Sequence, residues 1–239
     1  MFLAITAAAS VLAGAIASVS GFGIGSLLTP LFNVPYDMRL AVAAVSIPHL
    51  VATSLRLWLM RRDVNRQVLR SFGVMSAAGG LTGAILQQYA TAPGLTLVFA
   101  ALLIFAGLAG LTGFSERLRF GPRTGWIAGV LSGMLGGLVG NQGGIRSAAL
   151  LGSQLSPAAF VATATAAGLI VDAARMPVYV VMEHSRLVAD LGVIGVATVG
   201  VVVGTVAGRP ILRTLPPALF RKLVSALILV LGVYMLTRA

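Results

Sequence analysis

The chain has 239 residues, of which 58% are apolar and only 10% are charged. A soluble domain carries about 25% charged residues, so this chain has too few polar groups to cover a surface that faces water. Its formal net charge is +11, but the basic residues stand in short gaps between apolar runs, as in the cytoplasmic loops of membrane proteins. These features predict an all-α integral membrane protein and argue against nucleic-acid binding.

The chain has no cysteine and two histidines, His49 and His184. Thiolate chemistry and cysteine-bound metals are therefore excluded, and a histidine metal site is not expected. No nucleophile–base pair or phosphate-binding loop is visible, so we expect no enzyme activity, no metal and no cofactor. The amino-terminal run lacks the basic start of a signal peptide, and we interpret it as part of the mature protein.

Long apolar runs follow one another along the chain, and a helix needs about 20 apolar residues to cross a membrane. The long runs lie at 2–20, 40–60, 68–87, 93–113, 124–141, 158–182, 187–208 and 218–237. Two shorter runs, 26–34 and 145–152, each follow a glycine cluster. The connections are short, so we expect a single membrane domain over 1–239.

Charges between the runs predict the orientation of the chain, because cytoplasmic loops are rich in lysine and arginine. The gaps that should be cytoplasmic are 61–70, 114–123 and 209–222, and those that should be outside are 88–94 and 183–190. Counting crossings then requires 1–36 and 124–155 each to enter and leave on one side. We therefore expect two glycine-broken helical hairpins, each followed by three transmembrane helices. The alternative is eight plain spans with the short runs as loops.

An internal repeat supports this plan. Shifting the chain by 119 residues pairs 14–58 with 133–177, so that three glycines meet glycines and Arg56 meets Arg175. We expect one repeat at about 1–113 and an inverted one at about 124–239, with the binding site at the midplane between them. For the matched Gly14 and Gly133 we favour close helix packing.

The two glycine clusters, GFGIGSLLTP at 21–30 and GGLVGNQGGIRS at 136–147, suit an anion site. Glycine lets a helix break and a ligand approach, and a half-helix that starts there offers free N–H groups. Amides and an arginine add donors, although Arg146 has the alternative of snorkelling to the interface. The predicted substrate-binding residues are Gly21, Gly23, Gly25, Ser26, Gly140, Asn141, Gln142, Gly143, Gly144, Arg146 and Arg175.

Ionisable residues within the spans are costly and usually functional. Asp172 and Arg175 are three residues apart on one helix face, where they form either a structural pair or part of the mechanism. Arg56 stands close to Arg61, which favours snorkelling of its side chain. His49 is either a proton carrier or a packing residue. We assign His49, Arg56 and Asp172 to coupling or gating.

At these residues the chain resembles the sulfite exporter TauE/SafE family of bacterial and archaeal membrane proteins. The resemblance rests on GFGIGSLLTPLF and GMLGGLVGNQGGIRSAALL, each followed by an alanine-rich span, and it covers nearly the whole chain. Ile24 interrupts the first glycine run, and Ala149 stands where the first motif has Pro30. The resemblance implies movement of sulfur-containing anions, such as sulfite and organosulfonates, across the inner membrane.

We therefore predict a multi-pass secondary transporter of the bacterial inner membrane. It would export sulfite, sulfoacetate or another organosulfonate by alternating access between the two inverted repeats. The alternatives are an anion channel and a non-transporting membrane partner protein. The expected partners are a small anionic substrate, the lipid bilayer and, as one option, a second copy of the chain in a homodimer.

Overall fold

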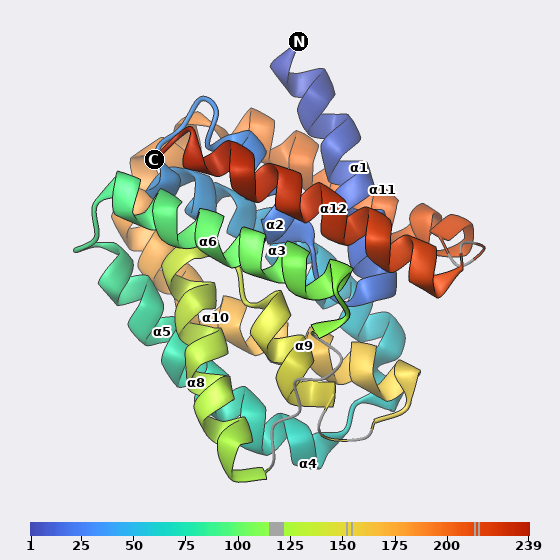
Figure 1. Ribbon diagram of the computed structural model, residues 1–239. Coiled ribbons are helices and arrows are strands. Elements are labelled where there is room, and N and C mark those ends of the chain that lie inside the picture. Colours follow the sequence, from blue (N-terminus) through green and yellow to red (C-terminus); the bar gives the residue numbers. More distant parts are fainter. Residues whose placement is uncertain (115–121, 152, 154, 213, 215) are drawn as a thin grey trace.

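The computed structural model describes residues 1–114, 122–151, 153, 155–212, 214 and 216–239. Its described part consists of helices joined by short connections, with no strand (Figure 1). The first half contains α1 (Phe2–Ser20), α2 (Ile24–Phe32), α3 (Met38–Met60), η1 (Arg61–Asp63), α4 (Arg66–Val68), the π-helical turn η2 (Leu69–Gly73), α5 (Val74–Gln87) and α6 (Ala92–Leu111). The second half contains α8 (Pro122–Val139), α9 (Gly143–Leu151), α10 (Pro157–Ala189), α11 (Leu191–Leu212) and α12 (Pro217–Leu236).

Seven helices in the described part are long and apolar enough to cross a membrane. Six of them coincide with the predicted crossings: α3, the continuous helix Arg66–Gln87, α6, α10, α11 and α12. The seventh is α1, the first arm of a predicted hairpin. The two short runs form the helices α2 and α9, and not the loops that eight plain spans would require. An all-α, multi-pass membrane fold is therefore confirmed.

One gap between the apolar runs is helical in the structure. The gap at 183–190, predicted to lie on the outer side of the membrane, continues α10 to Ala189, with a kink at Glu183. Glu183 and Arg186 stand about one turn apart and form an ion pair of 3.0 Å. Pairs at this spacing support a helix, so the charged segment continues α10 instead of ending it.

Glycines bring several pairs of helices into backbone contact, and two of these pairs involve the hairpins. Helix α1 packs along α11, and α5 packs along α8. A Cβ atom added to Gly14 would lie 2.2 Å from the carbonyl oxygen of Val201, and one added to Gly133 would lie 1.9 Å from that of Ser76. Small residues allow such close approach between membrane helices, so the packing role of Gly14 and Gly133 is confirmed. The first helix of each hairpin therefore packs against a transmembrane helix of the opposite half, α1 against α11 and α8 against α5.

The two halves repeat the same order of elements. Helices α9 and α10 begin at Gly143 and Pro157, which is 119 residues after α2 and α3 begin at Ile24 and Met38. In Figure 1, α1 descends from the N-terminus whereas α8 ascends. The order agrees with two repeats, while their inverted relation stays a prediction.

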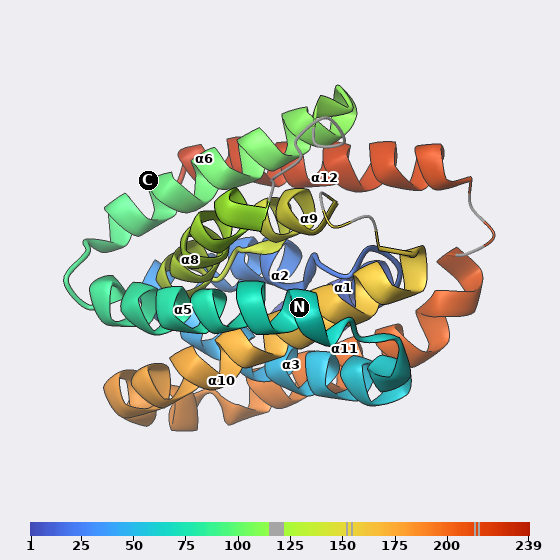
Figure 2. The same cartoon turned by 90° about the horizontal axis from the view of Figure 1, so that it is seen from below.

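The connections gather at two ends of the molecule. Figures 1 and 2 show the α5–α6 connection and the C-terminus at one end, and the α3–α4 junction at the other. The first end is held by the side-chain contacts Tyr36–Asp190, Asp37–Arg186, Arg39–Ala90 and Arg238–Val34. This grouping agrees with the charge pattern, which separates 88–94 and 183–190 from 61–70. Which end faces the cytoplasm stays a prediction.

Candidate functional site

The two helix breaks meet in the middle of the fold. A Cβ atom added to Gly25 would lie 2.5 Å from the carbonyl oxygen of Gly140, and one added to Gly143 would lie 2.7 Å from Cβ of Phe22. Ser26 Oγ lies 3.5 Å from Asn141 Oδ1, to which it donates a hydrogen bond. The predicted site residues of the two clusters are therefore brought together, and glycine is what allows the hairpin tips to touch.

The backbone at the breaks requires glycine for a second reason. Gly21, Gly23 and Gly140 have φ angles of 80°, 123° and 74°, a region that other residues rarely adopt. The first N–H groups of a helix have no acceptor within that helix, so α2 and α9 supply donors beside the breaks, as anion sites require. Gly144 is the second residue of α9, and its surroundings lie outside the described part.

Three arginines are buried around the breaks. Arg56, Arg146 and Arg175 are 3%, 2% and 2% exposed. The predicted snorkelling of Arg56 is wrong, because its guanidinium stays in the interior, where Nη1 donates to the Ala17 carbonyl at 2.5 Å and Nε donates to Thr165 Oγ1 at 3.0 Å. The snorkelling alternative for Arg146 also fails, because this side chain is buried.

Arg56 and Arg175 occupy equivalent places in the two halves. Arg175 Nη1 donates to the carbonyl of Gly136 at 2.5 Å, and Gly136 stands 119 residues after Ala17, which receives Arg56. Both carbonyls lie in the last turn of a hairpin's first helix, where the helix dipole is negative. Each arginine thus stabilises one helix end just before the break.

Asp172 is fully buried, and its carboxylate contacts two side chains, those of Arg175 and His49. Its Oδ1 accepts from Arg175 Nε at 3.1 Å and from Arg175 Nη2 at 2.8 Å, and its Oδ2 lies 2.6 Å from His49 Nδ1. Thr53 Oγ1 is 3.4 Å from the same histidine nitrogen. The Asp172–Arg175 pair expected from spacing is therefore present. His49 joins it from α3 and so links the two halves.

Arg146 and Gln142 retain polar atoms with no partner among the described residues. Arg146 Nη2 donates to the Gly21 carbonyl at 3.3 Å, but its Nε and Nη1 are buried and unpaired, as are Gln142 Nε2 and Oε1. A Cβ atom added to Gly168 would lie 2.6 Å from Arg146 Nη1, so glycine there leaves room for the guanidinium. An unmade buried hydrogen bond costs about 1–3 kcal/mol, and more for a charged group. Three of these atoms are donors and Gln142 Oε1 is an acceptor, so the cluster has hydrogen-bonding capacity that the described residues leave unused.

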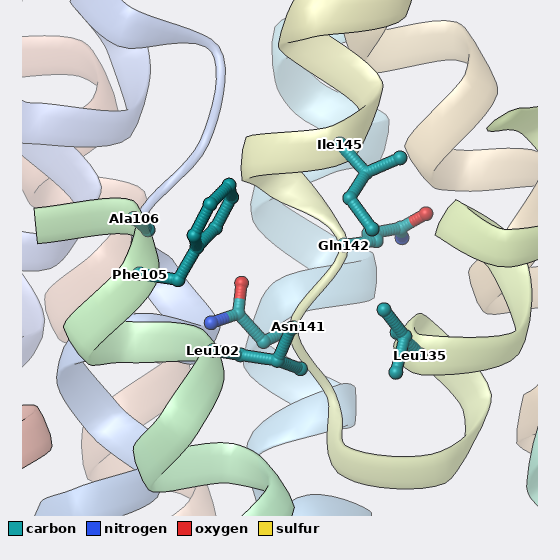
Figure 3. A pocket seen from close by; sticks show the side chains of 7 residues that line it. All are labelled: Leu102, Phe105, Ala106, Leu135, Asn141, Gln142 and Ile145. Atoms are coloured by element: carbon teal, nitrogen blue, oxygen red, sulfur yellow. The ribbon is translucent and has the colours of Figure 1, made fainter. Parts of the chain in front are cut away.

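A small cavity lies beside the second break (Figure 3). Its lining is Leu102, Phe105, Ala106, Leu135, Asn141, Gln142 and Ile145, and its volume is about 20 Å³, which is about the space that one water molecule needs. In Figure 3, Asn141 points towards Phe105 of α6, whereas Gln142 lies on the other side of the break. A larger anion beside Asn141 would require these side chains to move.

Sequence reasoning missed several neighbours of the site. Thr165 and Thr53 hold Arg56 and His49, while Phe22 and Phe105 cover the two breaks. The repeat offered one signal, because the shift of 119 residues pairs Thr53 with Asp172. Phe22 stands within the first glycine cluster, between Gly21 and Gly23, whereas no sequence signal was available for Phe105, which comes close to the second break only through packing.

One family of known proteins matches nearly the whole chain. The family model described as sulfite exporter TauE/SafE matches residues 6–235. No curated protein and no solved structure matches the chain.

Proposed function

Because this chain belongs to the sulfite exporter TauE/SafE family, whose members are membrane transporters of sulfite-type anions, we propose that it is a secondary transporter of a small sulfur-containing oxyanion. The substrate would be sulfite, sulfoacetate or another organosulfonate. It would be exported across the bacterial inner membrane, with the binding site between the two hairpin tips. A homodimer stays a prediction.

The balance of buried charge is the observation that carries this proposal. Around the breaks, three buried arginines face one buried aspartate, Asp172. With His49 neutral, two positive charges lack a counter-charge, and a buried ion without one costs several kcal/mol. An oxyanion supplies both the missing charge and the acceptor atoms that Arg146 and Gln142 lack.

The contacts separate the roles of the arginines. Arg146 keeps Nε and Nη1 free, and a guanidinium binds oxyanions through a planar pair of N–H groups. Arg175 is already engaged by Asp172 and Gly136, so it shapes the electrostatic field. Backbone N–H groups at the starts of α2 and α9, with Ser26 and Asn141, would complete the shell of donors.

Alternating access would require the hairpin tips to separate. The tips touch at Gly25 and Gly140, and the cavity beside Asn141 has room for about one water molecule. These features favour a carrier that changes conformation during transport and argue against a permanently open channel. The hydrogen bond between His49 and Asp172 joins α3 to α10, so a change in protonation there would alter the link between the halves.

Uptake of radiolabelled sulfite, thiosulfate and sulfoacetate into proteoliposomes tests the proposal. We compare Arg146→Gln with the control Arg62→Gln. Arg62 is an exposed residue of η1, so this control removes the same charge away from the candidate site. A hydrogen bond to a charged group contributes about 1.5–3 kcal/mol. Arg146→Gln should therefore raise the anion concentration that gives half-maximal uptake about 10- to 100-fold. The proposal fails if no anion moves or if both variants behave alike. Conductance in planar bilayers without saturation would identify a channel instead.

A further inference from the structure

A second hollow, with two arginines in its lining, lies apart from the hairpin tips. Its volume is about 600 Å³, and it is lined by Arg66, Gln67, Arg70, Ser71 and Trp126. We propose that this hollow binds a phosphate-bearing anion, presented in the membrane as the headgroup of an anionic phospholipid. None of its residues belongs to the substrate site, so the two proposals stand independently.

The two arginines of the hollow are available to a ligand. Arg66 and Arg70 are four residues apart at the start of a helix, a spacing that places side chains next to each other on one face. Both are exposed, and neither has an ion-pair or side-chain hydrogen-bond partner among the described residues. Two neighbouring guanidinium groups match the oxygens of a phosphate.

The position of the hollow fits the headgroup layer. The candidate span Arg66–Gln87 begins at Arg66, so the first turns of this helix stand where a membrane helix leaves the hydrocarbon. Trp126, near the start of α8, is 51% exposed, and tryptophan favours the membrane interface. Basic pockets on the cytoplasmic side are typical of anionic headgroup binding, and this segment belongs to the arginine-rich gap predicted to be cytoplasmic.

The surrounding charges provide a matched control. Arg61 and Arg62 belong to the same basic segment but do not line the hollow. Arg61 instead lies over the ring of Trp58, with 4.2 Å from its guanidinium carbon to the ring centroid. If the membrane attracted this segment only through its total charge, both arginine pairs would contribute alike. If the hollow is a site, only Arg66 and Arg70 matter.

A bound headgroup would join the two halves of the molecule. Arg66 to Ser71 precede α5, Trp126 belongs to α8, and these two helices pack along each other. A phospholipid that contacts both sides of the hollow would therefore stabilise the α5–α8 pair.

The test is the thermal stability of detergent-purified protein with added phosphatidylglycerol, phosphatidylcholine or inorganic phosphate. Phosphatidylglycerol should raise the Tm of the wild type and of Arg61→Gln/Arg62→Gln. The rise should be absent in Arg66→Gln/Arg70→Gln, and native mass spectrometry should show its phosphatidylglycerol binding weakened about 10-fold or more.

Three results are decisive. Equal loss in both double variants, or equal stabilisation by phosphatidylcholine, would overturn the proposal. Protection by inorganic phosphate that matches phosphatidylglycerol and disappears in Arg66→Gln/Arg70→Gln would support the phosphate site and identify a soluble anion as its source. Sulfite uptake by Arg66→Gln/Arg70→Gln is measured in parallel, so that failure here is distinguished from failure of the transport proposal.

Discussion

Replacing Arg146 should leave the ligand-free protein at least as stable as before and should reduce its response to the substrate. Arg146 is 2% exposed and donates one hydrogen bond of 3.3 Å, while its Nε and Nη1 are unpaired. The substitution Arg146→Met removes a hydrogen bond from a charged donor, which contributes about 1.5–3 kcal/mol. It also removes a buried charge whose desolvation costs several kcal/mol. The free energy of unfolding should therefore rise or stay unchanged.

Arg175→Met is the matched comparison, because Arg175 is equally buried but fully engaged. It donates to Asp172 at 3.1 Å and 2.8 Å and to the Gly136 carbonyl at 2.5 Å. Breaking a buried ion pair costs about 3–5 kcal/mol. For a chain of this size 1 kcal/mol corresponds to roughly 2–4 °C in Tm, so Arg175→Met should lower the Tm by roughly 6–20 °C.

The assay is thermal unfolding in detergent with and without the transported anion. At a concentration 100 times the Kd, a ligand adds about 2.7 kcal/mol, so the Tm of the wild type should rise by roughly 5–10 °C. Arg146→Met should lose about half of this rise or more, because a Kd weakened about 10- to 100-fold leaves about 0.4–1.4 kcal/mol at the same ligand concentration. The reasoning is refuted if this variant keeps the full anion-dependent rise, or if it loses as much ligand-free stability as Arg175→Met.

Three further outcomes are expected. Gly25→Ala should lower sulfite uptake about 10-fold or more, because the added Cβ would lie 2.5 Å from the Gly140 carbonyl oxygen of the other tip. The control Gly195→Ala should leave uptake unchanged, because a Cβ added there would meet no atom within 4 Å. His49→Gln keeps an amide donor for Asp172 but cannot titrate, so the change of uptake between about pH 5 and 8 should flatten; an unaltered pH profile would exclude His49 from coupling. Burial and the hydrogen bond to Asp190 raise the pKa of Tyr36 to about 12 from 10.0, so its contribution to stability is full below pH 10 and is lost as the pH rises towards 12. Tyr36→Phe should remove that loss in Tm measured against pH, and a loss of the same size in the variant would contradict the assignment.

Much of the fold could be predicted because the bilayer restricts what a chain can do. Backbone in hydrocarbon must satisfy its own hydrogen bonds, so each long apolar run had to become a helix. The breaks could also be predicted, since Gly21 and Gly140 sit at positive φ and keep their spacing in the sequence. The extension of α10 was missed although Glu183 and Arg186 stand at helical spacing, and the contact of Arg186 with Asp37, 149 residues away, leaves no signal along the chain.

The depth of Arg56 shows where sequence reasoning reaches its limit. Because Arg56 is close to Arg61 in the sequence, its side chain was predicted to reach the membrane interface. In the structure it is buried, because Ala17 and Thr165 offer acceptors from other helices. Contacts across the two halves leave no periodic signal along the chain. The same holds for the fit of Arg146 against Gly168, which no spacing rule reveals. The arginines could be identified as candidates, but not their different roles.

The exchange of packing partners between the halves has a consequence for how the protein is made. Helix α8 follows its packing partner α5 in the chain, so α5 is synthesised first. Helix α1 is instead synthesised long before its partner α11, which begins at Leu191. Until α11 arrives, the backbone at Gly14 has no Val201 to pack against. The first hairpin therefore gains this contact only after the second half has been made. The candidate site likewise draws on both halves, from Gly21 to Arg175, so it is complete only once α10 has been inserted.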